Sequence, residues 1–203
     1  NSTFVAVGES GTILTSSDGT TWTSRTSGTT ISLNDAEYGS DSFFVVGGRS
    51  SPATVPILKS NDGITWNQVS TISDSLYSIH YQNSIYIAAS LNGHIFTSSD
   101  GSSWTNRATN VTDGLLKSIA YGKSKYVIVG GYKTIVTSPN YISWTRTSYE
   151  GPGTTSYNDI VYSDDKFVLV GNSGTILTST DGTTWTSRTS GTSNNLNSVF
   201  SKE

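Results

Sequence analysis

The chain has 203 residues, only 13% of them charged, and a formal net charge of −3. No basic stripe is visible, which argues against a nucleic-acid partner, and the lack of cysteine excludes disulfides and thiolate metal sites. No apolar run approaches the roughly 18 residues of a membrane helix, so we expect no membrane insertion.

Five tryptophans divide the chain into parts of nearly equal length. Trp22, Trp66, Trp104, Trp144 and Trp185 are 44, 38, 40 and 41 residues apart, and 40 residues complete the circuit through the two termini. A period near 40 with one Trp and four strand-like runs is typical of a β-propeller with one blade per repeat. We therefore predict an all-β chain forming a single domain over residues 1–203, a five-bladed propeller of four-stranded antiparallel blades.

Each repeat contains four strand-like runs, and the chain opens directly on the second kind. This second run is nearly continuous in Val, Ile and Phe, as in a strand buried on both faces, and covers residues 4–7, 43–46, 85–88, 126–129 and 167–170. The third run covers residues 13–16, 57–60, 95–98, 135–138 and 176–179. The fourth begins at each Trp and is the most polar, which suits an outer edge strand. The first run covers residues 33–38, 76–81, 116–121, 157–162 and 196–201.

The two ends of the chain suggest how the propeller closes. The first repeat lacks its innermost strand, and the chain ends on a run of that kind at residues 196–201. We expect this run to pair into the N-terminal blade, three strands from one end and one from the other, since closure leaves no sheet edge open. The chain also contains no Met and shows no signal peptide, so we expect it to be a processed or excised segment.

The turn before each Trp carries a repeated motif, S-x-D-G-x-[TS]-W, as in Ser16–Trp22. Here the sequence resembles the Asp-box (BNR) propellers, which include sialidase-type enzymes and assembly-factor-like propellers. The Asp can accept hydrogen bonds from its own turn, Gly supplies a positive φ, and Trp covers the hairpin. We therefore assign a structural role to the Asp-box residues Asp18, Trp22, Asp62, Trp66, Asp100, Trp104, Asn140, Trp144, Asp181 and Trp185. In the fourth repeat Asn140 and Tyr141 replace Asp and Gly, and we expect a distorted hairpin there.

The sequence argues against a sialidase. Such an enzyme needs three arginines around one carboxylate, but four of the five arginines occupy the same repeat position and only Arg49 lies elsewhere. A glycoside hydrolase remains an alternative, because Asp35, Glu37 and Asp159 lie on predicted innermost strands and paired carboxyl groups can support hydrolysis. Small polar residues are also what a narrow central channel requires. We expect no enzyme activity, no cofactor and no metal site.

The loops joining the second and third runs vary most between repeats, and variable polar residues on a rigid scaffold are typical of a recognition surface. The candidate binding residues on this loop face are Glu9, Arg49, Asn92, His94, Tyr132, Lys133, Tyr149 and Asn172. With 11 Tyr and 5 Trp, we expect carbohydrate (glycan) recognition by a monomer, in an extracellular, cell-surface or virion setting. A protein-docking scaffold resembling the assembly-factor-like propellers is the competing hypothesis.

Overall fold

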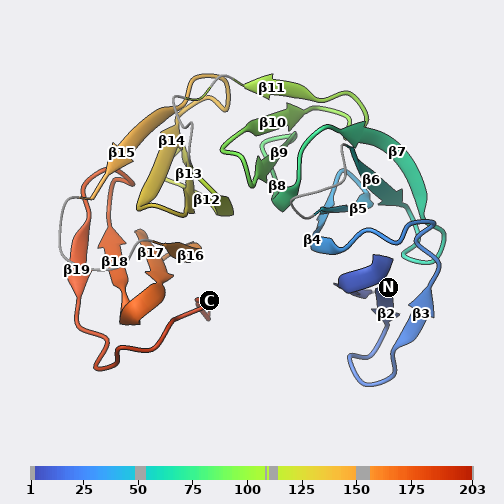
Figure 1. Ribbon diagram of the computed structural model, residues 1–203, viewed down its shortest axis with the longest axis horizontal. Helices are drawn as coiled ribbons and strands as arrows, with labels where there is room; N and C mark the ends of the chain where they lie inside the picture. Colours follow the sequence, from blue (N-terminus) through green and yellow to red (C-terminus); the bar gives the residue numbers. More distant parts are fainter. Residues whose placement is uncertain (1–2, 49–53, 108, 110–113, 150–155, 203) are drawn as a thin grey trace. The chain divides into compact units, whose positions relative to one another are not determined.

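The structure is a computed structural model (Figure 1), which describes residues 3–48, 54–107, 109, 114–149 and 156–202. It is all-β, with five antiparallel sheets in chain order, consistent with a five-bladed propeller. In the described part of the chain the only helices are two three-residue 3-10 turns, Glu9–Gly11 and Asn172–Gly174, so none could cross a membrane.

The five sheets follow the five repeats. The first contains β1 (Phe4–Val7), β2 (Ile13–Ser16) and β3 (Thr23–Arg25). The second contains β4 (Leu33–Gly39), β5 (Ser42–Gly47), β6 (Val55–Ser60) and β7 (Asn67–Ile72). The third contains β8 (Leu76–Gln82), β9 (Ile85–Ser90), β10 (Ile95–Ser98) and β11 (Thr105–Arg107). The fourth contains β12 (Leu116–Gly122), β13 (Lys125–Gly130), β14 (Thr134–Ser138) and β15 (Thr145–Ser148). The fifth contains β16 (Tyr157–Ser163), β17 (Lys166–Gly171), β18 (Ile176–Ser179) and β19 (Thr186–Arg188).

The outer strand of each sheet begins one residue after the Trp, not at it as expected. The tryptophans belong to the preceding hairpins. Trp104 Nε1 donates to the Gly101 carbonyl at 3.0 Å, and Trp144 Nε1 donates to the Tyr141 carbonyl at 3.3 Å. Trp66 Nε1 and Trp185 Nε1 have no hydrogen-bond partner among the described residues, so the one-residue offset does not depend on this bond.

Two compact units divide the chain. The first comprises residues 1–88 and 96–105, the second residues 89–95 and 106–203, and the third sheet contributes to both. Within each unit the core lies between successive sheets. In the first unit, Ile13 of β2 packs with Leu33, Val45 and Leu58 of the second sheet. The corresponding cluster of the second unit joins β13 and β14 to β16, β17 and β18.

The predicted closing strand at residues 196–201 is not found. The structure assigns no strand to these residues, and its first sheet has three strands, so the expected closure is not detected. The segment instead lies beside β16 and the end of β17. Its backbone groups form separate hydrogen bonds there and no β-ladder. The Leu196 amide donates to the Gly171 carbonyl at 3.0 Å, and the Val199 amide donates to Asp159 Oδ2 at 2.9 Å.

The Asp-box hairpins have the geometry that the motif predicts. Asp18 Oδ1 accepts the amides of Thr20 and Thr21 at 2.8 Å, Ser16 Oγ donates to the same oxygen, and Gly19 has a φ of +73°. These amides lower the pKa of Asp18 far below its usual range. The same pattern recurs at Asp62, Asp100 and Asp181.

The expected distortion of the fourth hairpin is wrong. Asn140 Oδ1 accepts the amides of Ile142 and Ser143 at 3.1 and 3.0 Å, and Tyr141 adopts a φ of +53°. An amide oxygen accepts the same two bonds as a carboxylate. A non-glycine residue in the left-handed region carries only a modest cost, so the hairpin keeps its form.

Candidate functional site

A β-bulge recurs at the second residue of the inner strands β4, β12 and β16. The bulged residues are Asn34, Lys117 and Asn158. A bulge re-aims its side chain, and here the side chain reaches the following repeat. Asn34 Nδ2 donates to the carbonyls of Gly48 and Leu76 at 2.9 and 2.8 Å.

Lys117 is the one bulged residue that carries a charge. Its Nζ donates to Ser156 Oγ at 2.8 Å and to Asn158 Oδ1 at 2.9 Å. Both acceptors are neutral, and burial lowers the pKa of the ammonium below its usual value. Within the described residues it has no carboxylate partner. Because an ammonium has three donors, one N–H of Lys117 is left for another acceptor.

A turn with an exposed aromatic side chain is bridged to Ser156, one of the two acceptors of this lysine. Gly131 forms a β-bridge with Ser156, and Tyr132 and Lys133 follow with φ of 51° and 56°. The side chain of Tyr132 is 62% exposed. The corresponding turns Ser10–Gly11 and Ser173–Gly174 place a small residue and Gly in this conformation. Tyr132 and Lys133 thus depart from the residues of the corresponding turns.

Asn172 joins the same group. Its Oδ1 accepts Asn158 Nδ2 at 2.9 Å, and its amide donates to the Ser156 carbonyl at 3.0 Å. We call Lys117, Tyr132, Ser156, Asn158 and Asn172 the Lys117 group. All five belong to the second unit, and three of them come from inner strands or the residues just before them.

The other candidates from the sequence have different surroundings. Tyr149 is half-buried and packs against the core of the second unit, so it does not stand free as expected for a stacking residue. Asn92 and His94 are exposed on a turn in which both amides donate to Ser90 Oγ. Glu9 is exposed at the first 3-10 turn, in the first unit. Arg49 lies outside the described residues.

Lys117 and Ser156 were not among the site residues predicted from the sequence, although the sequence contains a signal for the lysine. The second position of the inner-strand run holds Asn34, Tyr77, Lys117, Asn158 and Asn197. A single charged residue in a row of uncharged ones marks a departure from the repeat. Ser156 carries no such signal, because it precedes the run.

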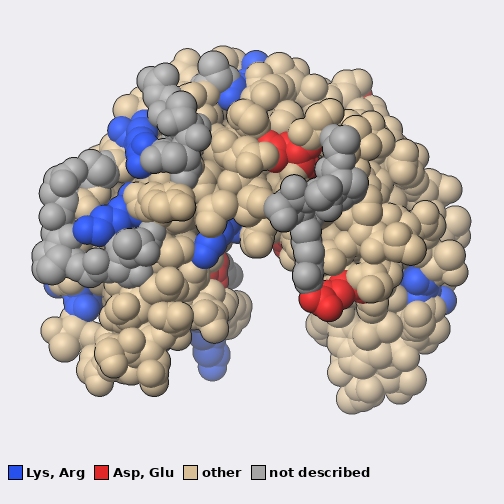
Figure 2. Space-filling view, in the orientation of Figure 1, with Lys and Arg blue, Asp and Glu red and all other residues tan. Residues whose placement is uncertain are grey.

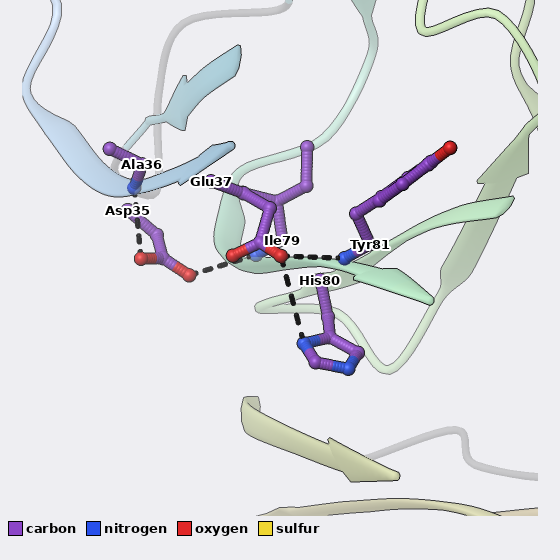
Figure 3. A network of polar contacts seen from close by, with 6 residues as sticks. All are labelled: Asp35, Ala36, Glu37, Ile79, His80 and Tyr81. Atoms are coloured by element: carbon purple, nitrogen blue, oxygen red, sulfur yellow. Dashed lines mark hydrogen bonds and ion pairs between the residues drawn. The ribbon is translucent and has the colours of Figure 1, made fainter. Parts of the chain in front are cut away.

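A second polar cluster lies in the first unit, where β4 faces β8 (Figure 3). Asp35 Oδ2 accepts the Ile79 amide and Glu37 Oε1 accepts the Tyr81 amide, each at 2.9 Å. Glu37 Oε1 also lies 4.0 Å from His80 Nδ1. His80 Nε2 is buried and has no hydrogen-bond partner among the described residues.

Burial shifts both ionisable groups of this pair toward neutrality. Burial raises the pKa of Glu37 to about 7. The hydrogen bond from the Tyr81 amide opposes this rise, and the negative charge of Asp35 adds to it. Burial also lowers the pKa of His80. The fifth position of the inner-strand run is apolar in the other repeats, at Ala120, Val161 and Phe200. A facing Glu and His therefore depart from the repeat together.

The carboxylates considered for hydrolysis hold strands together. Asp159 Oδ2 accepts the Val199 amide and Ser198 Oγ, while its Oδ1 accepts the Ile160 amide and Ser118 Oγ. Asp35 and Glu37 bond to β8 in a similar way. Among the residues described, no group of three or more His, Asp or Glu could hold a metal ion.

Comparisons with known proteins agree on the fold. A family model described as the DUF6242 beta propeller domain matches residues 110–202. The structure resembles YCF48 bound to D1 peptide, with a TM-score of 0.68 and 20% identity over 92% of this chain and 63% of that one. It also resembles virginiamycin B lyase from Staphylococcus aureus, with a TM-score of 0.74 and 14% identity over 91% of this chain and 68% of that one. For YCF48 from Cyanidioschyzon merolae the TM-score is 0.57 and the identity 15%, over 91% of this chain and 80% of that one.

These likenesses support a β-propeller and do not extend to the Asp-box family. The chain spans about 63% of the length of the peptide-bound YCF48 that it matches. No curated protein matches the sequence.

Proposed function

We propose that this chain is a non-enzymatic protein-interaction module that holds a peptide segment of its partner on the Lys117 group. The observation that carries the proposal is the exposed Tyr132 on a turn bridged to Ser156, which accepts a hydrogen bond from a lysine without a carboxylate partner in the described part of the chain. Tyrosine is among the residues that contribute most of the binding energy at protein interfaces. The peptide-bound YCF48 of similar fold supports the proposal, since it is a propeller that takes a peptide ligand.

Tyr132 suits the role of an anchor. A tyrosine brings a large apolar face and a hydroxyl at a low cost in conformational entropy. Its turn is connected to the inner strands through the Gly131–Ser156 bridge, and the Thr134 amide donates to the Gly131 carbonyl at 2.9 Å. A rigid support of this kind reduces the ordering cost of binding.

Carbohydrate recognition is the second candidate. The exposed Tyr132 and Asn172, which are both connected to Ser156, favour it. Other tyrosines pack inside the protein, since Tyr86, Tyr126 and Tyr157 are fully buried. A groove of about 710 Å³ in the first unit is lined by Ser, Thr and Gly with Arg25 and Ile31, and it offers no aromatic face for a sugar. These features make a peptide the better ligand.

The absence of enzyme activity is part of the proposal. One neighbour of similar fold is a lyase, and the hydrolase alternative rests on Asp35, Glu37 and Asp159. Because each of these carboxylates accepts a backbone amide of an adjacent inner strand or segment, we assign them to the fold. We further propose an Asp-box-type ring closed by residues 196–201, a monomeric state and an extracellular, cell-surface or virion setting.

A peptide-display selection followed by titration of the selected peptides tests the proposal. Tyr132→Ala should weaken the binding of a selected peptide by roughly tenfold or more, because an aromatic anchor is removed. Tyr77→Ala is the matched control, since Tyr77 is 40% exposed on β8 of the first unit. If both variants bind equally well, the site is misplaced. If no peptide is selected while a glycan array gives a signal, carbohydrate recognition replaces peptide binding as the proposed function.

A further inference from the structure

We propose that the Lys117 ammonium is a carboxylate subsite, which pairs with a C-terminal carboxylate or an Asp or Glu side chain of the bound peptide. This inference rests on the proposed function and names the chemistry of the ligand. It depends on four features. These are the neutral partners of Lys117, the residues at its position in other repeats, the described acidic residues of the second unit, and the N–H of Lys117 that has no acceptor among the described residues.

The neutral partners leave the charge uncompensated. A partly buried ammonium loses hydration and regains it only in part from hydroxyl and amide oxygens. Among the described residues, Lys117 Nζ has only Ser156 Oγ and Asn158 Oδ1 as partners, at 2.8 and 2.9 Å. An anion on the third donor would compensate more of the loss, because opposite charges attract strongly where solvent is partly excluded.

The counterparts show that the fold does not require a lysine here. Asn34 and Asn158 occupy the same bulge, and each bridges to the next repeat through its Nδ2. The bridge needs a hydrogen-bond donor and not a positive charge. The charge of Lys117 is therefore an addition to the shared architecture.

Three acidic residues among those that the structure describes in the second unit have partners of their own. Asp159, on the adjacent strand β16, accepts four hydrogen bonds from two amides and two hydroxyls. Asp165 pairs with Lys123 at 2.6 Å, and Asp181 binds its own hairpin amides at 2.7 Å. Lys123 thus has an internal carboxylate partner, whereas Lys117 has none in the described part of the chain.

One acceptor of Lys117 is connected to the exposed turn. Ser156, which accepts Lys117, is bridged to Gly131, and Tyr132 follows directly. A peptide whose side chain packs on Tyr132 could place a carboxylate on Lys117. Capture of a carboxylate by fixed donors is a recurring mode of peptide recognition.

The experiment uses simple probes. Acetyl-triglycine with a free carboxylate, acetyl-triglycine amide and acetyl-Gly-Glu-Gly amide are titrated into ¹⁵N-labelled protein. We expect saturable shifts at the amides of Gly131, Ser156 and Asn158 with the first or the third probe, and none with the second. Which of the two carboxylate probes binds identifies the source of the carboxylate.

Lys117→Asn is the informative variant, because Asn is the residue that the fold uses at this bulge elsewhere. It should weaken carboxylate binding by at least about tenfold, with an unchanged unfolding midpoint. Lys117→Arg keeps the charge and should retain binding within about threefold. Lys123→Asn is the matched control and should leave binding unchanged.

The inference is overturned if the amide probe binds as well as the acid, or if Lys117→Asn binds the acid normally. A selected peptide that depends on Tyr132 but not on Lys117 would overturn the carboxylate subsite and leave the proposed function standing. Loss of peptide binding altogether, with the acid probe still bound at Lys117, would overturn the proposed function alone.

Discussion

Glu37 and His80 are the clearest departures from the repeat at the scale of single residues. They face each other across β4 and β8 at a position that is apolar in the other three repeats. Their side chains are 26% and 27% exposed, so burial favours the neutral form of both. A protonated Glu37 beside a neutral His80 is the arrangement that this environment favours.

Stability should therefore depend on the ionisation of Glu37. Its pKa is raised from 4.5 to about 7, so the folded state holds the proton more tightly than the unfolded state. The stabilisation is complete below about pH 4.5 and is lost as the pH rises through 7. Glu37→Gln keeps the acceptor for Tyr81 without the titration. It should be more stable than the parent by about 1–3 kcal/mol at pH 8, and equally stable at pH 4.

Urea unfolding at a series of pH values measures this difference. The lowered pKa of His80 acts in the opposite direction, since its contribution is lost as the pH falls below its ordinary value of 6.5. Because both proteins keep His80, the difference between them isolates Glu37. A constant difference between pH 4 and pH 8 would contradict the assignment.

At the scale of the elements, the inner strands of successive repeats are joined by side chains. Asp35 accepts the Ile79 amide, Ser118 accepts the Ile160 amide, and Asp159 accepts the Val199 amide. All three acceptors occupy the third position of the inner-strand run. Inner strands of different sheets share no ladder, so a short polar side chain supplies the acceptor that a carbonyl would otherwise provide.

Removal of such an acceptor should cost much of the stability of the second unit. Asp159→Ala leaves two amides and two hydroxyls without their acceptor and should destabilise by about 2–4 kcal/mol. Asp159→Ser restores the residue that other repeats use and should recover about half of the loss. Thermal unfolding of the three proteins gives the comparison, and an Ala variant as stable as the Ser variant would refute the role of the third position.

At the scale of the whole molecule, the two units differ in charge. The first carries eight acidic and three basic residues, and the second carries nine basic and seven acidic residues. Figure 2 shows basic side chains over the sheets of the second unit and acidic side chains over those of the first. The low overall charge thus conceals an excess of basic residues in the unit that holds the Lys117 group.

The C-terminal segment is held by the second unit through several hydrogen bonds. Leu196 bonds to Gly171 and Asn158, and Ser198 and Val199 bond to Asp159. Deletion of residues 196–203 should therefore destabilise the protein by about 2–5 kcal/mol, more than eight terminal residues suggest. Denaturant unfolding measures the effect.

Deletion of residues 200–203 alone is the control for this truncation. It retains every bond named above, and Phe200 is 89% exposed, so we expect a change below about 0.5 kcal/mol. A large loss in this shorter truncation would show that Phe200 packs against another part of the protein, as the proposed ring closure requires. An unaffected longer truncation would contradict the role of the segment.

The strands and hairpins could be predicted because their causes are local. Alternation of apolar residues and the Ser-x-Asp-Gly motif act within a few residues, so runs such as 13–16 and the hairpin at Asp18 follow from the chain itself. The expectation for Asn140 was wrong because the hairpin requires only an oxygen acceptor and a left-handed turn, which Asn and Tyr supply as well as Asp and Gly.

The repeat, its strands and its hairpins were thus determined by the sequence alone, since periodicity and turn chemistry are encoded in neighbouring residues. The Lys117 group, the Glu37–His80 pair and the bonds of Asp159 were decided only by the tertiary structure. Their members lie about 40 residues apart and meet because bulged inner strands of successive repeats pack side by side. No local pattern encodes which side chains face each other across that boundary.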